Sequence, residues 1–210
     1  MFKLISRRAL TLAFAAGLAA SILPAYADDA DTSKDAILND PATPASGNKK
    51  GDLTIVVFFD YNCPYCKMAE PDLERMVKAD GKIKLVYKEW PILTEASVKG
   101  SQWALAARYQ GKYDVAHRAL MAIPGHKIMA DQMREAISNA GVDMTRLDAD
   151  LTAHADEIEA MLKRNLAQAN YLGLQGTPAY IVGVYRVTSA LNYDGFKKVA
   201  ADARARMSKN

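Results

Sequence analysis

The pattern of apolar and polar positions predicts a mixed α/β chain. Residues Leu53–Phe59 form a continuous apolar run rich in β-branched and aromatic side chains, which is typical of a strand buried on both faces. The run ends in a polar turn, where Asp60 and Asn62 suit turn and cap positions. A helical pattern follows, with a kink or a delayed start expected near Pro71. Residues Lys82–Tyr87 predict a second strand, so this part is a βαβ unit with parallel strands.

The pattern then stays helical from about residue 94 to 172. Helices are expected over Thr94–Tyr109, about Tyr113–Ala122, Asp131–Ala140, and from about Thr145 or Thr152 to Tyr171. A helical stretch of this length between two sheet-forming parts indicates an inserted helical subdomain. Its methionines are interpreted as core residues, with an adaptable peptide-binding face as the alternative. They are Met121, Met129, Met133, Met144 and Met161.

Strand character returns near the C-terminus. Residues Pro178–Val182 and Val184–Thr188 predict a hairpin, and a final helix is expected over Tyr193–Met207. Composition alone predicts a trans Thr177–Pro178 bond, because only about 5–6% of X–Pro bonds in folded proteins are cis.

The first 27 residues have the features of a secretory signal peptide. Lys3, Arg7 and Arg8 precede an apolar run, Ala9–Leu23, and residues 24–27 end in an A-x-A cleavage pattern, so cleavage after Ala27 is expected. Residues 28–50 are polar and predict an N-terminal arm with one short helix near Asp35 and a short edge strand. The apolar run is shorter than the roughly 20 residues of a membrane-spanning helix, and a retained anchor is the lesser alternative.

Removing the predicted signal peptide balances the charge of the chain. It holds three of the 27 Lys and Arg residues and none of the 24 Asp and Glu residues, so 24 of each sign remain. No nucleic-acid or anionic-membrane partner is therefore expected. Export also places the chain in a compartment that permits disulfides.

The two cysteines stand directly after the first predicted strand, as Cys63-Pro64-Tyr65-Cys66. Cys63 occupies the expected helix N-cap, and Pro64 suits the first helical turn. Unpaired N–H groups and the positive end of the helix dipole stabilise a thiolate there. Cysteines in such motifs have pKa values between about 3.5 and 7.5, against about 8.5 for a free cysteine. We predict that Cys63 is the nucleophile and that Cys66 is the resolving thiol.

A zinc site is the main alternative for the two cysteines. Structural zinc needs about four ligands, and the chain has no further cysteine. His117, His126 and His154 show no ligand spacing and are interpreted as surface or helix-end residues. A redox pair is favoured, with a metal-carrying binding protein as the rival.

Glu89 follows the second predicted strand and has two interpretations. It is either a solvated carboxylate at the strand end or a partly buried carboxylate that relays the proton of Cys66 during exchange. Lys88 is a weaker candidate for the same neighbourhood.

Taken together, these features resemble the DsbA-type thiol:disulfide oxidoreductases of the thioredoxin superfamily. The resemblance covers roughly residues 40–209 and rests on two motifs, Phe58–Lys67 and Gly176–Ala179. It implies an α/β, thioredoxin-like domain over residues 51–210, with the helical insertion at about 94–172. It also implies that the Thr177–Pro178 bond is cis and faces the cysteines, and that the Thr177 backbone pairs with an extended substrate peptide.

The resemblance also assigns roles within the motif. Cys63 is expected to be exposed and Cys66 buried. Pro64 and Tyr65, together with Glu89 from its position after the second strand, are expected to tune the redox chemistry. Many strong oxidases of the family carry His before the second cysteine and Val before the cis-proline. The chain has Tyr65 and Thr177 at these positions, as in disulfide isomerases and reductases.

The expected function is a periplasmic thiol:disulfide oxidoreductase that exchanges its own disulfide with cysteines of exported proteins. Oxidation is favoured, because a monomer without a dimeric cleft suits simple donation. An isomerase or reductase kept reduced by a membrane electron donor is the alternative. No cofactor is expected beyond the redox-active Cys63–Cys66 disulfide, and a membrane redox partner would reset it.

Overall fold

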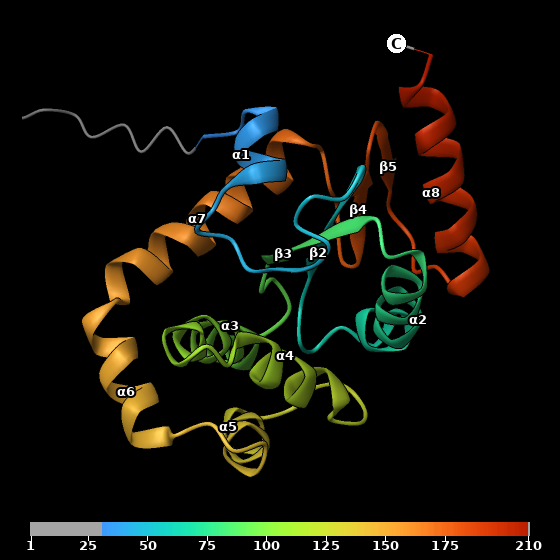
Figure 1. The fold of residues 1–210 in the computed structure, drawn as a ribbon. Coiled ribbons are helices and arrows are strands. Elements are labelled where there is room, and N and C mark those ends of the chain that lie inside the picture. The colour runs from blue at the N-terminus through green and yellow to red at the C-terminus, as the bar shows by residue number, and fades with distance from the viewer. Residues whose placement is uncertain (1–30, 210) are drawn as a thin grey trace, which may run out of the picture.

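A five-stranded sheet lies at the centre of the fold (Figure 1). The computed structural model describes residues 31–209, so the predicted signal peptide and its cleavage after Ala27 lie outside the described residues. The strands are β1 (Ala45–Gly47), β2 (Leu53–Phe59), β3 (Ile83–Glu89), β4 (Ala179–Val182) and β5 (Tyr185–Val187), in the spatial order β1-β3-β2-β4-β5. β2 and β3 are parallel, as the sequence predicts, and the other neighbouring strands are antiparallel.

Helices cover both faces of this sheet. They are α1 (Lys34–Asn39), α2 (Pro64–Asp80), α3 (Glu95–Ala107), α4 (Tyr113–Ala122), α5 (Ala130–Asn139), α6 (Met144–Ala153), α7 (Ala155–Tyr171) and α8 (Tyr193–Met207), with a 3-10 turn at Arg108–Gln110. Alternate residues of β2 point to opposite faces. Ile55 and Val57 join a core that includes α2 and α8, and Val56 and Phe58 join a second core that includes α1 and α7.

The inserted helical subdomain is formed by α3 to α7, between β3 and β4. Figure 1 shows α3, α4, α5 and α6 gathered at one end of the sheet, with the long α7 returning along its side. The fold is therefore the expected mixed α/β, thioredoxin-like arrangement with a helical insertion. Within the described residues, no helix combines the length and the apolar character needed to cross a bilayer.

Three local predictions were wrong. α2 begins at Pro64 and continues through Pro71, so the delayed start, one of the two alternatives expected there, is wrong. The last helix of the insertion is two helices, which meet at His154. The Thr177–Pro178 bond is cis, against the composition-based expectation and in agreement with the resemblance.

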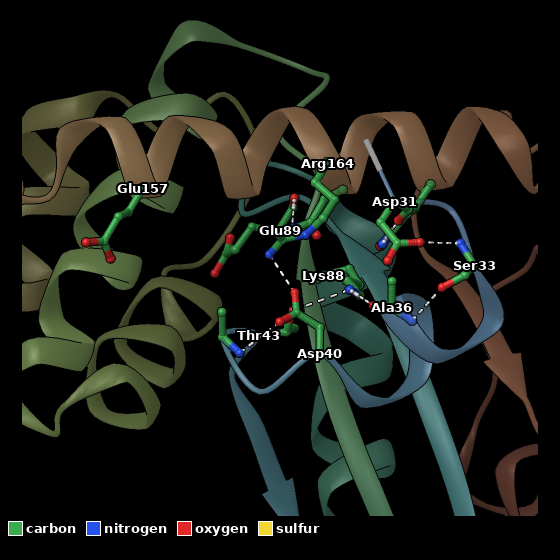
Figure 2. A network of polar contacts seen from close by, with 12 residues as sticks. Asp31, Ser33, Ala36, Asp40, Thr43, Lys88, Glu89, Glu157 and Arg164 are labelled. Atoms are coloured by element: carbon green, nitrogen blue, oxygen red, sulfur yellow. Dashed lines mark hydrogen bonds and ion pairs between the residues drawn. The ribbon is translucent and has the colours of Figure 1, made fainter. Parts of the chain in front are cut away.

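The N-terminal arm contains the predicted short helix and edge strand. Hydrogen bonds join it to β3, and an ion pair joins it to α7 (Figure 2). The Arg164 guanidinium lies 2.5 Å from the Asp40 carboxylate. The Lys88 ammonium donates to the Ala36 carbonyl at 3.2 Å and to the Thr43 hydroxyl at 3.3 Å. The Lys88 side chain thus binds the N-terminal arm, and the prediction that it lies near the cysteines is wrong. Burial lowers the pKa of Lys88 to about 8.

Candidate active site

Cys63 caps the N-terminus of α2, directly after the polar turn that ends β2. Its backbone is extended, with φ −80° and ψ 115°, and its sulfur accepts a hydrogen bond from the Cys66 N–H at 3.4 Å. Pro64 fills the first helical position, where a missing N–H costs no helical hydrogen bond. Both cysteines are free thiols in this structure. The local sequence therefore places one sulfur at the positive end of a helix and the other one turn inside it.

The two thiols have opposite acidity. A hydrogen bond from the Cys66 thiol lowers the pKa of Cys63 to about 6; burial opposes this shift, and the Thr177 hydroxyl and backbone N–H groups of α2 support it. Burial, together with the neighbouring Cys63 sulfur, raises the pKa of Cys66 far above its ordinary value. At neutral pH one proton therefore remains on Cys66, and Cys63 is mainly a thiolate.

The cis-proline loop lies against this sulfur. The Cys63 thiol, when protonated, donates to the Thr177 carbonyl at 3.2 Å, although the two residues are 114 positions apart. The structure thus brings together Cys63, Cys66, Thr177 and Pro178, the residues that the two motifs single out. Pro64 and Tyr65 lie in the same turn and are exposed to solvent.

The expectation of an exposed Cys63 is wrong for this conformation. Cys63 has 3% of its surface exposed and Cys66 has 2%, so exposure does not distinguish them. The Cys63 sulfur lies 3.2 Å from the Thr177 carbonyl, and this contact with the cis-proline loop contributes to its burial. The two pKa values differ because the Cys63 sulfur accepts hydrogen bonds at the first turn of α2, whereas burial of Cys66, one turn further along, disfavours its thiolate.

Glu89 is fully buried, so the solvated strand-end interpretation is wrong. Its carboxylate accepts hydrogen bonds from the hydroxyls of Tyr61 at 2.8 Å, Tyr113 at 2.9 Å and Ser101 at 2.7 Å. Burial raises the pKa of Glu89 to about 7, against the His117 charge and these hydroxyl donors, which lower it. Among the contacts of the described residues, none joins Glu89 directly to a cysteine.

A buried polar chain connects Glu89 to the active-site helix instead. The Tyr61 hydroxyl lies 3.0 Å from His117 Nδ1, and His117 Nε2 lies 3.1 Å from the Glu70 carboxylate. Glu70 is one turn after Cys66 in α2 and shares its face. The chain leads from Glu89 through Tyr61 and His117 to Glu70, and among the contacts of the described residues none joins the Glu70 carboxylate to a cysteine.

His117 is a buried member of this chain, so its interpretation as a surface or helix-end residue was wrong. Burial alone lowers the pKa of His117, but the hydrogen bond and charge of Glu70, with the charge of Glu89, raise it overall. His126 is exposed, and His154 stands between α6 and α7, where its ring stacks on Tyr109 at 3.6 Å. Among residues 31–209, no group of three His, Cys, Asp or Glu side chains is placed to hold a metal ion.

The polar turn before Cys63 has a larger role than its sequence pattern suggests. The buried Asp60 carboxylate accepts hydrogen bonds from the N–H groups of Ile92 at 2.8 Å and Leu93 at 2.9 Å. It also accepts from the Ser97 hydroxyl at 2.6 Å and from the Asn62 N–H at 2.7 Å. The short-range signal for a turn was present in the sequence, but these long-range partners were not visible in it.

Known proteins similar to this chain are described as thiol:disulfide exchange proteins or oxidoreductases. The family model described as the DSBA-like thioredoxin domain matches residues 54–200. A thioredoxin-like oxidoreductase from Silicibacter pomeroyi is 38% identical, covers 82% of this chain and 98% of its own, and superposes with a TM-score of 0.77. The thiol-disulfide exchange protein alpha-DsbA2 from Wolbachia pipientis is 30% identical over 80% of this chain and 90% of its own, with a TM-score of 0.75. The thiol:disulfide interchange protein DsbA of Bordetella parapertussis is 29% identical over 193 residues, 88% of this chain and 90% of that protein.

Proposed function

The chain belongs to the DsbA-like thioredoxin family and is a disulfide oxidoreductase, and we propose that it oxidises the cysteines of exported proteins in the periplasm. The observation that carries the proposal is the opposite acidity of the two thiols at the start of α2. A thiolate that persists at neutral pH is a good leaving group, and its stability favours the reduced form of the protein over the disulfide. Both effects favour transfer of the disulfide to a substrate.

The proposed reaction has two exchange steps. A substrate thiolate attacks the Cys63 sulfur of the Cys63–Cys66 disulfide, and Cys66 leaves as a thiolate and takes up a proton. A second substrate thiolate then attacks the substrate sulfur of the mixed disulfide, and Cys63 leaves as a thiolate. Two substrate thiols become one disulfide, and the protein gains the two electrons. A membrane redox partner is proposed to remove these electrons and restore the disulfide.

The remaining predicted residues receive supporting roles in this proposal. The backbone of Thr177 next to Pro178 is proposed to pair with an extended substrate segment beside Cys63. Pro64 and Tyr65 are proposed to tune the pair from the first turn of α2. Glu89 is proposed to act on Cys66 only through the buried polar chain, as a positioning residue. Localisation in the periplasm is proposed. It is supported by the predicted signal peptide and by the similarity to a periplasmic thioredoxin-like protein of Salmonella enterica, which is 30% identical. The protein is proposed to act as a monomer.

Tyr65 and Thr177 support a second candidate, a reductase or isomerase, because these residue types replace His and Val of many strong oxidases. The potential of the Cys63–Cys66 pair separates the two directions. Equilibration with glutathione buffers is expected to give a reduction potential of about −120 mV, which is typical of the DsbA oxidase. A value well below about −200 mV would support the reductase and contradict the oxidase.

A further inference from the structure

His117 lies among aromatic rings where the helical insertion meets the sheet. It belongs to α4 and has 2% of its surface exposed. Four ring centroids lie 4.7 to 5.7 Å from the centroid of its imidazole, those of Phe59, Tyr61, Tyr87 and Tyr113. The Tyr113 ring is nearly parallel to the imidazole, at an interplanar angle of 17°. Aromatic rings at such distances stabilise a cation that lies over their faces, so these surroundings suit a charged imidazole.

The Tyr61 hydroxyl determines the protonation of one imidazole nitrogen. This hydroxyl donates to the Glu89 carboxylate at 2.8 Å, and an ionised carboxylate can only accept. The Tyr61 proton therefore points toward Glu89, and the Tyr61 oxygen offers only lone pairs to His117 Nδ1, which lies 3.0 Å away. Nδ1 carries a proton in order to make this bond.

Glu70 determines the protonation of the other imidazole nitrogen. Its carboxylate lies 3.1 Å from His117 Nε2, and an ionised carboxylate accepts, so Nε2 also carries a proton. Only a doubly protonated imidazolium satisfies both bonds. The charged groups that face it are Glu70 and Glu74 of α2 and Glu89 of β3. Glu74 is itself paired with Arg118 at 3.0 Å, so Glu70 and Glu89 are left to compensate the imidazolium.

The two hydrogen-bond partners of His117 stand on either side of the cysteine pair in the sequence. Tyr61 is in the turn before Cys63, and Glu70 is in α2, one helical turn after Cys66. Both partners are buried. One side chain of α4 therefore holds both ends of the segment 61–70, which carries the two sulfurs. Among the described residues no hydrogen bond joins His117 to a sulfur, so its effect on the cysteines is positional.

We propose that His117, as an imidazolium, is a positioning residue that holds the segment 61–70 so that the Cys66 sulfur can attack a mixed disulfide at Cys63. The inference rests on the proposed function and adds a residue of the helical insertion to it. This attack needs the two sulfurs in contact, and a displacement of about 1 Å can slow such a step about 100-fold. Without the imidazolium, the buried Glu70 carboxylate has no charged partner, and the resulting cost favours a shift of α2.

The protonation of His117 is measured directly by NMR. Long-range ¹H–¹⁵N spectra of the mature protein with ¹⁵N-labelled histidine distinguish an imidazolium from the two neutral tautomers. The His117 signals are assigned by their absence from His117→Gln. At neutral pH, His117 is expected to show two protonated nitrogens in the unmodified protein. A neutral tautomer would overturn the proposal.

The positioning role is measured as the rate of a single exchange step. The Cys63 thiolate of the reduced protein attacks oxidised glutathione, one glutathione thiolate leaves, and a mixed disulfide forms. Cys66 then loses its proton and attacks the Cys63 sulfur, which releases the second glutathione thiolate. Acid quenching and mass spectrometry follow the mixed disulfide. His117→Gln should slow its decay about tenfold, at the lower end of what a hydrogen bond to a charged group contributes, while the rate of its formation stays unchanged.

Further variants separate a positioning role from a general loss of structure. The double variant Glu70→Gln with His117→Gln removes both partners of the buried pair and should recover part of the decay rate. The matched control is His154→Gln, which removes a histidine paired with the exposed Glu157 and should leave the decay unchanged. If circular dichroism melting shows that His117→Gln fails to fold, Tyr61→Phe takes its place. It removes only the hydroxyl that accepts from His117 and should also slow the decay.

The outcomes separate this inference from the proposed function. A decay rate that folded His117→Gln leaves intact, or that Tyr61→Phe leaves intact where His117→Gln does not fold, would overturn the positioning role while the oxidoreductase assignment stands. A double variant slower than His117→Gln alone would overturn it as well. Absence of exchange with glutathione and with reduced peptides in the unmodified protein would overturn the proposed function itself, and the role of His117 with it.

Discussion

Replacing Glu89 with Gln is expected to remove a pH-dependent loss of stability. The Glu89 carboxylate is fully buried, and its pKa rises from 4.5 in the unfolded chain to about 7 in the folded protein. Gln has nearly the same shape and can accept from the Tyr61 and Tyr113 hydroxyls, while the Ser101 hydroxyl can rotate to accept from its amide. The substitution therefore removes the ionisation and keeps most of the packing.

The sign of the effect follows from which state holds the proton more tightly. Below pH 4.5 Glu89 is protonated in both states and has no effect on stability. As the pH rises from 4.5 to 7, the unfolded chain releases this proton first, so the free energy of unfolding falls. Each pKa unit corresponds to about 1.4 kcal/mol, so the wild type is expected to lose about 3 kcal/mol over this range through Glu89.

Urea unfolding of the oxidised protein between pH 5 and 8 measures this loss. The oxidised form is used because Cys63 does not titrate in a disulfide. The difference in unfolding free energy between Glu89→Gln and wild type should grow by about 2.5 kcal/mol from pH 5 to pH 8. His117, whose pKa is raised partly by the charge of Glu89, also loses its contribution to stability as the pH rises. Glu89→Gln weakens that contribution, so the measured difference includes this coupled part. A difference that stays constant from pH 5 to 8 would refute the argument, because Glu89 would then ionise as easily in the folded protein as in the unfolded chain.

Three further predictions concern the cysteines and the core. Cys63→Ser should abolish exchange with peptides, and turnover retained in this variant would contradict the nucleophile assignment. Cys66→Ser should accumulate mixed disulfides at Cys63, visible by non-reducing electrophoresis and mass spectrometry; finding no such adducts would contradict the resolving role. Leu73→Ala should reduce the free energy of unfolding by about 2–5 kcal/mol in a urea titration, because Leu73 is fully buried between α2 and the sheet, and a loss below about 1 kcal/mol would contradict its place in the core.

Local signals predicted most of the fold. The predictions of the β2 strand and of the βαβ order were correct, and so were the limits of the helices Tyr113–Ala122 and Tyr193–Met207. These features depend on the period of apolar residues and on turn residues, which can be read from a short stretch of sequence. The break at His154 was missed because the apolar spacing continues across it. The continuous α2 through Pro71 shows that tertiary packing can outweigh the loss of one helical hydrogen bond.

Only those residues of the site that belong to its two sequence motifs were predicted. The Cys-x-x-Cys pair and the Thr-Pro pair identified the residues that meet at the start of α2, although they are 114 positions apart. The partners of Glu89 were not predictable, since Tyr61, Ser101 and Tyr113 come from the β2–α2 turn, α3 and α4, which only the tertiary fold brings together. The same holds for Asn62, whose partner Ile128 is 66 positions away.

The central claim is that the start of α2 holds Cys63 as a thiolate while Cys66 stays protonated. The most direct test is the rate of alkylation of each cysteine in the reduced protein as a function of pH, with the modified residue identified by mass spectrometry. The account predicts that Cys63 reacts first, with a midpoint at about pH 6, and that Cys66 stays unreactive through neutral pH. Equal reactivity of the two thiols, with midpoints at about 8.5 as in a free cysteine, would contradict it.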